Sequence, residues 1–237
     1  MTFRDDLMTA RDAIVKSNFT VRDGSVVPTT ADVGYNEAVK LQATYLYADL
    51  IDSSGLVAIS PQLTVGKILR LYLDLNVRII RNNGGGIRSF DGDRVMGIFV
   101  GITRFDQAVK TAMQIKWACN NIIQPEIVKR YQSIANNAWT IRPACGIATG
   151  DALVVRGGVR RADNDLVSVG LAPNLAAKLS DIRTDTDHVR IGAGTYKNLS
   201  DASRLSNGKN MWTGPENITI GGKSYSYLRS NYYWSIP

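Results

Sequence analysis

The chain has 237 residues, of which 44% are hydrophobic and 21% charged, a composition typical of an ordinary folded domain and not of a disordered chain. No apolar run approaches the roughly 20 residues needed to cross a bilayer, and residues 1–6 lack the apolar core of a secretory signal. We therefore expect a cytoplasmic protein that binds no membrane. The formal charge of +7 favours an anionic ligand such as a polyphosphate, but its even spread argues only weakly for nucleic acid.

Cysteine and histidine usage gives no indication of a disulfide or a zinc site. Cys119 and Cys145 are far apart and both lie in apolar, periodic stretches, so we expect buried thiols. The only histidine, His188, lies outside every motif described below, and we interpret it as structural.

The N-terminal half begins with a segment that we take as an extension, residues 1–40, ahead of one domain over residues 41–237. The extension contains a short helix over residues 5–17 and a loop over residues 23–30. The domain then shows, in chain order, features that predict a strand over 43–49, a helix from Pro61 that ends at the glycines of 82–86, a hairpin over 87–99 and a long helix over 108–122 that Pro125 interrupts.

The C-terminal half predicts shorter elements. In order, they are a strand over 139–148 closed by a turn at 149–151, an apolar run over 152–155, a basic loop over 156–163, a strand over 166–169, a helix over 173–180 with Pro173 at its first position, and then a strand over 189–191, a helix over 195–199 and strands over 218–227. This order predicts an α+β fold with a mixed or antiparallel sheet and helices over one face.

Two aspartates carry the main functional indication. Asp49 ends the apolar strand and precedes the polar stretch Asp52–Gly55, and Asp93 lies in the turn of the predicted hairpin. If that strand lies beside the hairpin, the two carboxylates meet at one edge, where they can hold Mg²⁺ or Mn²⁺ against a triphosphate. Aspartate is also common at strand ends and in turns without any metal, so neither residue is decisive alone.

Four motifs in a fixed order resemble the class III nucleotidyl cyclases, which close a nucleoside triphosphate to a 3′,5′-cyclic monophosphate. The resemblance covers about residues 43–200 and rests on segments Tyr47–Ser54, Phe90–Phe99, Cys145–Gly150 and Val169–Leu179. It implies the ferredoxin-like cyclase catalytic domain, with a sheet and helices packed over it. It also implies two divalent cations, Mn²⁺ or Mg²⁺, bound by Asp49, Leu50 and Asp93.

The resemblance also assigns residues to the substrate. It places Ser53 and Ser54 at the phosphate turn and Asn174 at the catalytic asparagine. Lys178 stands four residues later, where the family usually has arginine, so either Lys178 or an arginine of residues 156–161 takes that role, and a merely solvated position is the alternative. Lys223 is a candidate for the outer phosphates, although Gly221–Lys223 is equally a hairpin turn.

The base-reading positions differ from those of the purine cyclases. Ser89 stands where adenylate cyclases carry lysine, and Val167 where they carry aspartate or threonine. Neither residue reproduces the hydrogen bonds that read a purine. The chain is similar to the pyrimidine cyclases of bacterial anti-phage systems, which implies UTP as substrate and cyclic UMP as product, with Ser89 reading the base and Arg88, Tyr45 or Tyr47 filling the space of a purine. Cytidylate and adenylate cyclase activity remain alternatives.

The resemblance further implies a homodimer with shared sites, in which one protomer supplies the aspartates and its partner the Asn174 helix. Other classes fit less well. A diguanylate cyclase would show Gly-Gly-Asp/Glu-Glu-Phe on its hairpin, where this chain has Phe90–Arg94. A catalytically silent homologue or a nucleic-acid module would require a lost metal aspartate or aromatic platforms among basic residues, and both aspartates are present.

Overall fold

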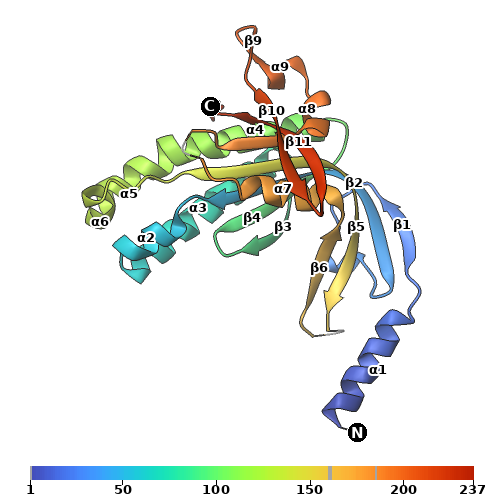
Figure 1. Ribbon diagram of the computed structural model, residues 1–237. Coiled ribbons are helices and arrows are strands. Elements are labelled where there is room, and N and C mark those ends of the chain that lie inside the picture. The colour runs from blue at the N-terminus through green and yellow to red at the C-terminus, as the bar shows by residue number, and fades with distance from the viewer. Residues whose placement is uncertain (1, 160–161, 185) are drawn as a thin grey trace.

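The apolar run that includes Asp49 forms the central strand of the sheet in the computed structural model, which describes residues 2–159, 162–184 and 186–237. This strand, β2 (Glu37–Leu50), pairs antiparallel with β5 (Pro143–Gly158) along almost its whole length. The β3–β4 hairpin pairs with the other edge of β2, and β7 joins β5 in parallel, so the sheet is mixed (Figure 1). The expected α+β fold is confirmed.

The sheet has nine strands in the described part of the chain, in the order β10-β11-β7-β5-β2-β4-β3, with β1 on β2 and β6 on β5. In chain order, the elements are α1 (Phe3–Val15), β1 (Thr20–Gly24), η1 (Thr30–Asp32), β2, α2 (Ser53–Ile59), α3 (Gln62–Asn82), β3 (Gly86–Asp91), β4 (Arg94–Phe99), α4 (Arg104–Ala118), η2 (Cys119–Ile123), α5 (Gln124–Arg130), α6 (Gln132–Asn136), β5, β6 (Asn164–Val169), α7 (Leu171–Ser180), β7 (Val189–Gly192), α8 (Ala193–Lys197), α9 (Asp201–Arg204), β8 (Leu205–Ser206), β9 (Lys209–Asn210), β10 (Thr213–Ile220) and β11 (Lys223–Ser230).

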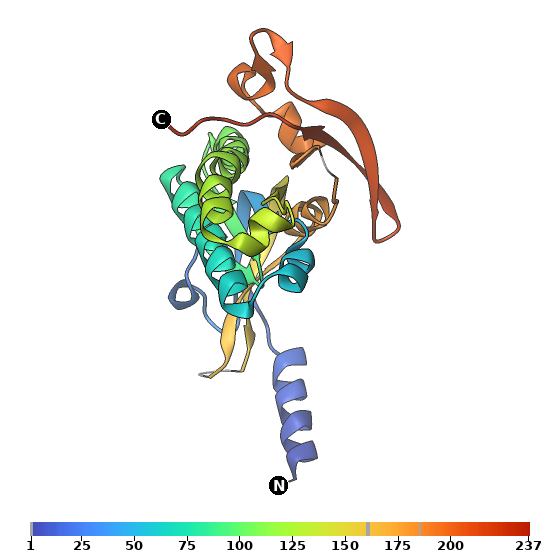
Figure 2. The same ribbon diagram turned by 90° about the vertical axis from the view of Figure 1, so that its left-hand side faces the viewer.

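Helices cover both faces of the sheet, and the expectation of helices over one face was wrong. Alternate residues of β2 enter two separate cores: Leu46 and Leu50 pack with α3 and α4, whereas Leu41 and Tyr45 pack with α7. Figure 2 shows α3 and α4 lying side by side. A strand buried on both faces reads as a continuous apolar run, which does not reveal that a second layer is present.

The turn predicted at residues 149–151 was also wrong, because β5 continues through it. Gly150 pairs with Ala43 of β2, and a Cβ added to Gly150 would lie 3.3 Å from the Cβ of Ala172 in α7. The glycine therefore allows a helix to approach the strand instead of forming a turn. Pro173 is the third residue of α7, not the first, and still lies in the turn whose N–H groups have no helical partner.

Other expectations hold within the described residues. Pro125 does interrupt the long helix, which passes through a π turn, η2, before α5. Cys119 and Cys145 are buried free thiols, and burial raises the pKa of Cys145 to about 12.

Part of the predicted basic loop, residues 160–161, lies outside the described residues. The division at residue 40 stays a prediction, and β1 from the proposed extension pairs with β2. Among the described helices, none has the length and apolarity of a membrane span.

Candidate active site

The strand register brings the two aspartates to the same edge of the sheet. Ala48 of β2 pairs with Val95 of β4, so Asp49 and the Asp93–Arg94 turn follow at the same end. This arrangement confirms the expected neighbourhood of strand and hairpin. Asp49 is only 2% exposed, and the Oδ2 atom of Asp93 is buried without a hydrogen-bond partner among the described residues. An unpaired buried carboxylate oxygen is costly unless a cation or donor meets it.

Two arginines contact Asp49, and the sequence analysis assigned no role to either. Its Oδ2 accepts hydrogen bonds from Arg94 Nη2 at 3.0 Å and from Arg183 Nη2 at 2.7 Å. Arg183 also donates through Nη1 to the Leu50 carbonyl oxygen at 2.6 Å. The hydroxyl of Tyr72 in α3 donates to the Asp49 carbonyl at 2.8 Å and fixes its backbone. The carboxylate is thus held by two positive charges in a rigid frame.

The donor atoms at this edge fit a divalent cation. Two carboxylates and the Leu50 carbonyl are hard oxygen ligands of the kind that Mg²⁺ and Mn²⁺ prefer, and Leu50 can contribute only its backbone because its side chain is in the core. The Arg183 guanidinium bridges Asp49 and this carbonyl, so these oxygens already converge on one positive charge. No cluster of three or more His, Cys, Asp or Glu side chains suited to a metal occurs in the part of the chain described.

The predicted phosphate turn directly follows this edge. Ser53 and Ser54 are the first residues of α2, and Asp52 before them adopts a left-handed backbone with φ of 61°. A Cβ on Gly55 would collide with the Asp52 carboxylate, so the glycine makes room for this tight entry into the helix. The two serines therefore lie where the chain leaves β2, directly after Asp49 and Leu50.

Helix α7 presents the predicted catalytic pair on its outer side. A Cβ on Gly146 would collide with the Ala176 carbonyl, so this glycine lets α7 lie directly on β5. Asn174 and Lys178 both point away from the sheet and are exposed. Asn174 makes no side-chain hydrogen bond within the described residues. Lys178 Nζ lies 3.5 Å from Asp181.

One chain of ion pairs connects this helix with the carboxylate edge. Asp181, which follows α7, accepts from Arg94 at 2.5 Å as well as facing Lys178, and Arg94 in turn contacts Asp49. The end of α7 is therefore fixed relative to Asp49, while its outer face stays open to solvent.

The predicted base-reading residues lie on β3 and β6. Ser89 Oγ lies 3.8 Å from the sulfur of Met96, and Val167 is 50% exposed. Arg88 forms an ion pair with Asp165 of β6, and its role in filling the space of a purine stays a prediction.

The two tyrosine candidates differ in access. Tyr45 is fully buried, and its burial raises the pKa of its hydroxyl. Tyr47 is half-buried, and the Arg94 guanidinium lies 5.9 Å from its ring centroid, a cation–π distance. Of these two candidates, Tyr47 is therefore the one that borders the carboxylate edge. Lys223 is exposed at the start of β11, after the two-glycine turn of a hairpin that projects from the body (Figure 2).

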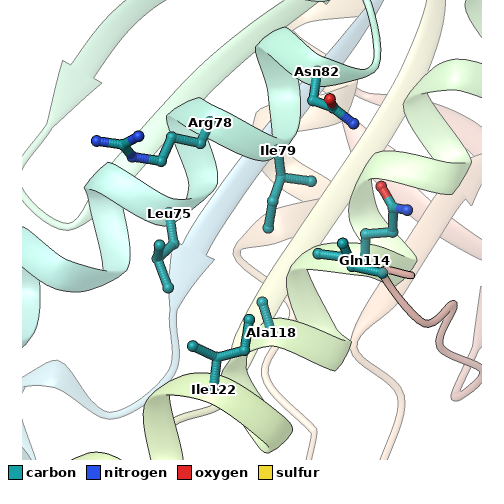
Figure 3. A pocket seen from close by; sticks show the side chains of 8 residues that line it. Leu75, Arg78, Ile79, Asn82, Gln114, Ala118 and Ile122 are labelled. Atoms are coloured by element: carbon teal, nitrogen blue, oxygen red, sulfur yellow. The ribbon is translucent and has the colours of Figure 1, made fainter.

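A separate apolar pocket of about 320 Å³ lies between α3 and α4 (Figure 3). It is lined by Leu75, Arg78, Ile79, Asn82, Gln114, Ala118, Ile122 and Ile236. None of the residues predicted for catalysis or binding lines this pocket. Its walls supply a single charged group, so it does not match a triphosphate.

Solved structures share this fold. The guanylyl cyclase Cya2 matches 82% of this chain and 94% of its own with a TM-score of 0.67 and 19% identity. The adenylyl cyclase CyaB from P. aeruginosa matches 82% of this chain and 95% of its own, with a TM-score of 0.64 and 20% identity. The fold is therefore that of a class III nucleotide cyclase catalytic domain.

Sequence relatives narrow the class further, although no family model matches the chain. The uridylate cyclase of Rhodovulum sp. (strain MB263) is 38% identical over 95% of this chain and 97% of its own length. The uridylate cyclases of Xanthomonas perforans and Burkholderia cepacia are 36% and 34% identical over the full length of both chains. This chain belongs to the uridylate cyclase family.

Proposed function

We propose that this enzyme converts UTP to 3′,5′-cyclic UMP and pyrophosphate. The observation that carries the proposal is the convergence of Asp49, the Leu50 carbonyl and the unpaired Oδ2 of Asp93 at one edge, beside Tyr47. This arrangement supports a metal-dependent phosphoryl transfer, and the uridylate cyclase relatives support the uracil base.

In the proposed reaction, the ribose 3′-oxygen loses its proton to solvent and forms a bond to the α-phosphorus, while the bond from that phosphorus to the bridging oxygen of the β-phosphate breaks and pyrophosphate leaves. Two divalent cations, Mn²⁺ or Mg²⁺, supply a lowered pKa for the 3′-hydroxyl and charge neutralisation on the phosphates when bound. Asp49, Asp93 and the Leu50 carbonyl would hold these cations. Ser53 and Ser54 donate to the phosphates.

Asn174 and Lys178 act on the other side of the substrate. They are one helical turn apart on the exposed face of α7, so an amide can orient the ribose while an ammonium group meets charge on the α-phosphate. Lysine provides a point charge without the planar fork of arginine. Lys223 is proposed for the outer phosphates.

The preference for a pyrimidine follows from what the base pocket lacks. Ser89 and Val167 cannot form the paired hydrogen bonds of a purine site, and a site that leaves a base unpaired discriminates strongly against it. We propose that Tyr47, whose ring centroid lies 5.9 Å from the Arg94 guanidinium, takes the space that a second ring would need. Ser89 is proposed to form a hydrogen bond with the smaller pyrimidine ring.

The proposed active form is a head-to-tail homodimer with two equivalent sites, because the exposed side of α7 needs a triphosphate held by another copy. Apolar residues next to this helix support a covered surface: Leu153, Val167, Val169 and Leu171 are all exposed in the single chain. We propose that the product is a second messenger in anti-phage defence and that the enzyme works in the cytoplasm.

The test is to incubate the purified protein with UTP, CTP, ATP or GTP and Mn²⁺ and to identify products by mass. Cyclic UMP from the wild type, but not from Asp93→Ala, is the expected result. Cyclic CMP or cyclic AMP as the main product would correct the base assignment, and no cyclic product from any triphosphate would favour a silent nucleotide-binding homologue.

A further inference from the structure

Helix α1 has an apolar stripe that no described part of the chain covers. Phe3, Leu7, Ala10 and Ile14 recur at steps of four, three and four residues, and none of the residues of α1 is buried. Phe3 is 76%, Leu7 53% and Ile14 59% exposed. In Figure 1 the helix extends away from the sheet, joined to β1 by residues 16–19 alone.

A helix of this length has little stability of its own in water. Isolated helices shorter than roughly 12–15 residues are marginal, and most helical stability in proteins comes from packing of an apolar face. The local contacts of α1 include a capping box between Thr2 and Asp5 and exposed ion pairs of Asp12 with Lys16 at 3.1 Å and with Arg11 at 2.6 Å. Such contacts contribute only about 1 kcal/mol each, so the stripe needs a partner.

The pattern of α1 matches one helix of a coiled coil. Steps of four, three and four place Phe3, Leu7, Ala10 and Ile14 on the d, a, d and a positions of a heptad. Asp6 then lies on one flank of the stripe, at a g position, and Arg4 and Arg11 lie on the other flank, at e positions. The charges on the two flanks are thus of opposite sign.

The flanking charges select the partner and its direction. In a parallel pair, a g residue faces the e residue five positions later on the other helix, so Asp6 of one copy lies opposite Arg11 of the other. In an antiparallel pair, e residues face each other, which would bring Arg4 near Arg11 and cause repulsion. Complementarity therefore favours a second, parallel copy of the same helix.

A lipid surface fits α1 less well than a second copy. Helices that lie on membranes usually carry a polar face rich in lysine and arginine. The polar residues of α1 include Asp5, Asp6 and Asp12 against Arg4 and Arg11, so the helix offers no basic face to anionic lipid.

We infer that α1 forms a parallel two-stranded coiled coil with α1 of a second copy of this chain. The inference rests on the proposed function only in requiring the homodimer, and a parallel pair around a two-fold axis is compatible with that dimer's symmetry. Leu7 then faces Leu7 of the other copy at the centre of the seam.

Cysteine cross-linking tests the inference in the full-length protein. Leu7→Cys should form a disulfide-linked dimer rapidly under mild oxidation, because equivalent a positions of parallel helices lie within disulfide reach. Thr9→Cys, on the outer side of the same helix, is the matched control and should cross-link at least tenfold more slowly. Cys119 and Cys145 are both buried and do not compete.

Different outcomes separate the alternatives. Preferential cross-linking in a mixture of Leu7→Cys with Ala10→Cys, over either variant alone, would show antiparallel helices and overturn the inference. Equal rates for Leu7→Cys and Thr9→Cys, or sedimentation of the wild type with phosphatidylglycerol vesicles that Leu7→Asp abolishes, would overturn it as well.

The same preparations distinguish this inference from the proposed function. Cyclic nucleotide formation without Leu7→Cys cross-linking would contradict the coiled coil and still support the proposed cyclase activity. Cross-linking of Leu7→Cys in a protein that forms no cyclic nucleotide would support the coiled coil and contradict the proposed cyclase activity. As a further check, Leu7→Asp should weaken dimerisation at least tenfold in sedimentation equilibrium, with an unchanged circular dichroism signal from the sheet.

Discussion

The carboxylate edge and the outer face of α7 carry the two halves of the proposed chemistry, and they differ in how far a single chain completes them. Asp49 is buried and contacts Arg94, Arg183 and the backbone of its own neighbours. Asn174 and Lys178 lie on an exposed helix face, and Lys178 has one loose ion pair. The proposed metal half is thus buried and hydrogen-bonded within one chain, whereas the proposed ribose half is exposed.

This difference fits the proposed homodimer, in which each chain supplies two half-sites and no whole one. In the proposed metal half, the carboxylate and the backbone are already placed, so a cation has only to displace the Arg183 guanidinium from Asp49 and Leu50. An open α7 face has no such support, so its residues gain fixed positions only when another surface meets them. The comparison leads to predictions that affect the two halves differently.

The largest effect is expected for Asp93→Ala. Loss of one metal carboxylate should lower kcat/KM by roughly a thousandfold, equivalent to about 4 kcal/mol of transition-state stabilisation, and chelation should have the same result. The melting temperature should hold or rise, because Oδ2 of Asp93 makes no hydrogen bond within the described structure. Asp91→Ala on the same hairpin is the control, and an equal loss of activity there would contradict the assignment.

The stability of the folded chain should depend on pH through the buried His188. His188 is buried with Nδ1 3.0 Å from the Pro143 carbonyl, and burial, with Lys116 nearby, lowers the pKa of His188 from 6.5 to about 4. Between about pH 6.5 and about pH 4, the unfolded chain therefore binds a proton at His188 and the folded chain does not. The free energy of unfolding should consequently fall by about 3 kcal/mol as the pH is lowered across that range.

Urea unfolding at pH 7 and pH 4.5 measures this loss. His188→Gln keeps a hydrogen-bonding side chain without the titration and should reduce the difference between the two pH values. If the free energy of unfolding of His188→Gln differs between the two pH values as much as that of the wild type, a group other than His188 takes up the proton.

A smaller effect is expected for Arg183→Ala. The guanidinium contacts the same two oxygens, Asp49 Oδ2 and Leu50 O, that are proposed to bind metal, so its removal should tighten Mn²⁺ binding by about three- to tenfold without nucleotide. Electron paramagnetic resonance of free Mn²⁺ measures the affinity. Arg78→Ala, an exposed arginine paired with Asp74, is the control. Weaker binding by Arg183→Ala would mean that Arg183 supports the ligands instead of competing for them.

Local patterns were enough to predict the two aspartates, the hairpin and the helix with Asn174, since each depends on residues close together in sequence. Arg183 was missed because it reaches Asp49 from a loop more than 130 positions away, and no local pattern records such a contact. Gly150 was assigned to a turn for a related reason. A glycine that makes room for a helix and a glycine that forms a turn look alike until α7 is in place.

Each proposed site is built from two copies of the chain, and mixing two inactive variants tests this arrangement. Asp93→Ala lacks the metal half and Asn174→Ala the ribose half, and each should be nearly inactive alone. When equal amounts are mixed and allowed to exchange subunits, half of the dimers should be mixed, each with one intact site, so about a quarter of wild-type UTP cyclase activity should return. A mixture as inactive as its parents, with subunit exchange demonstrated, would show that the two halves belong to the same chain and contradict the shared site.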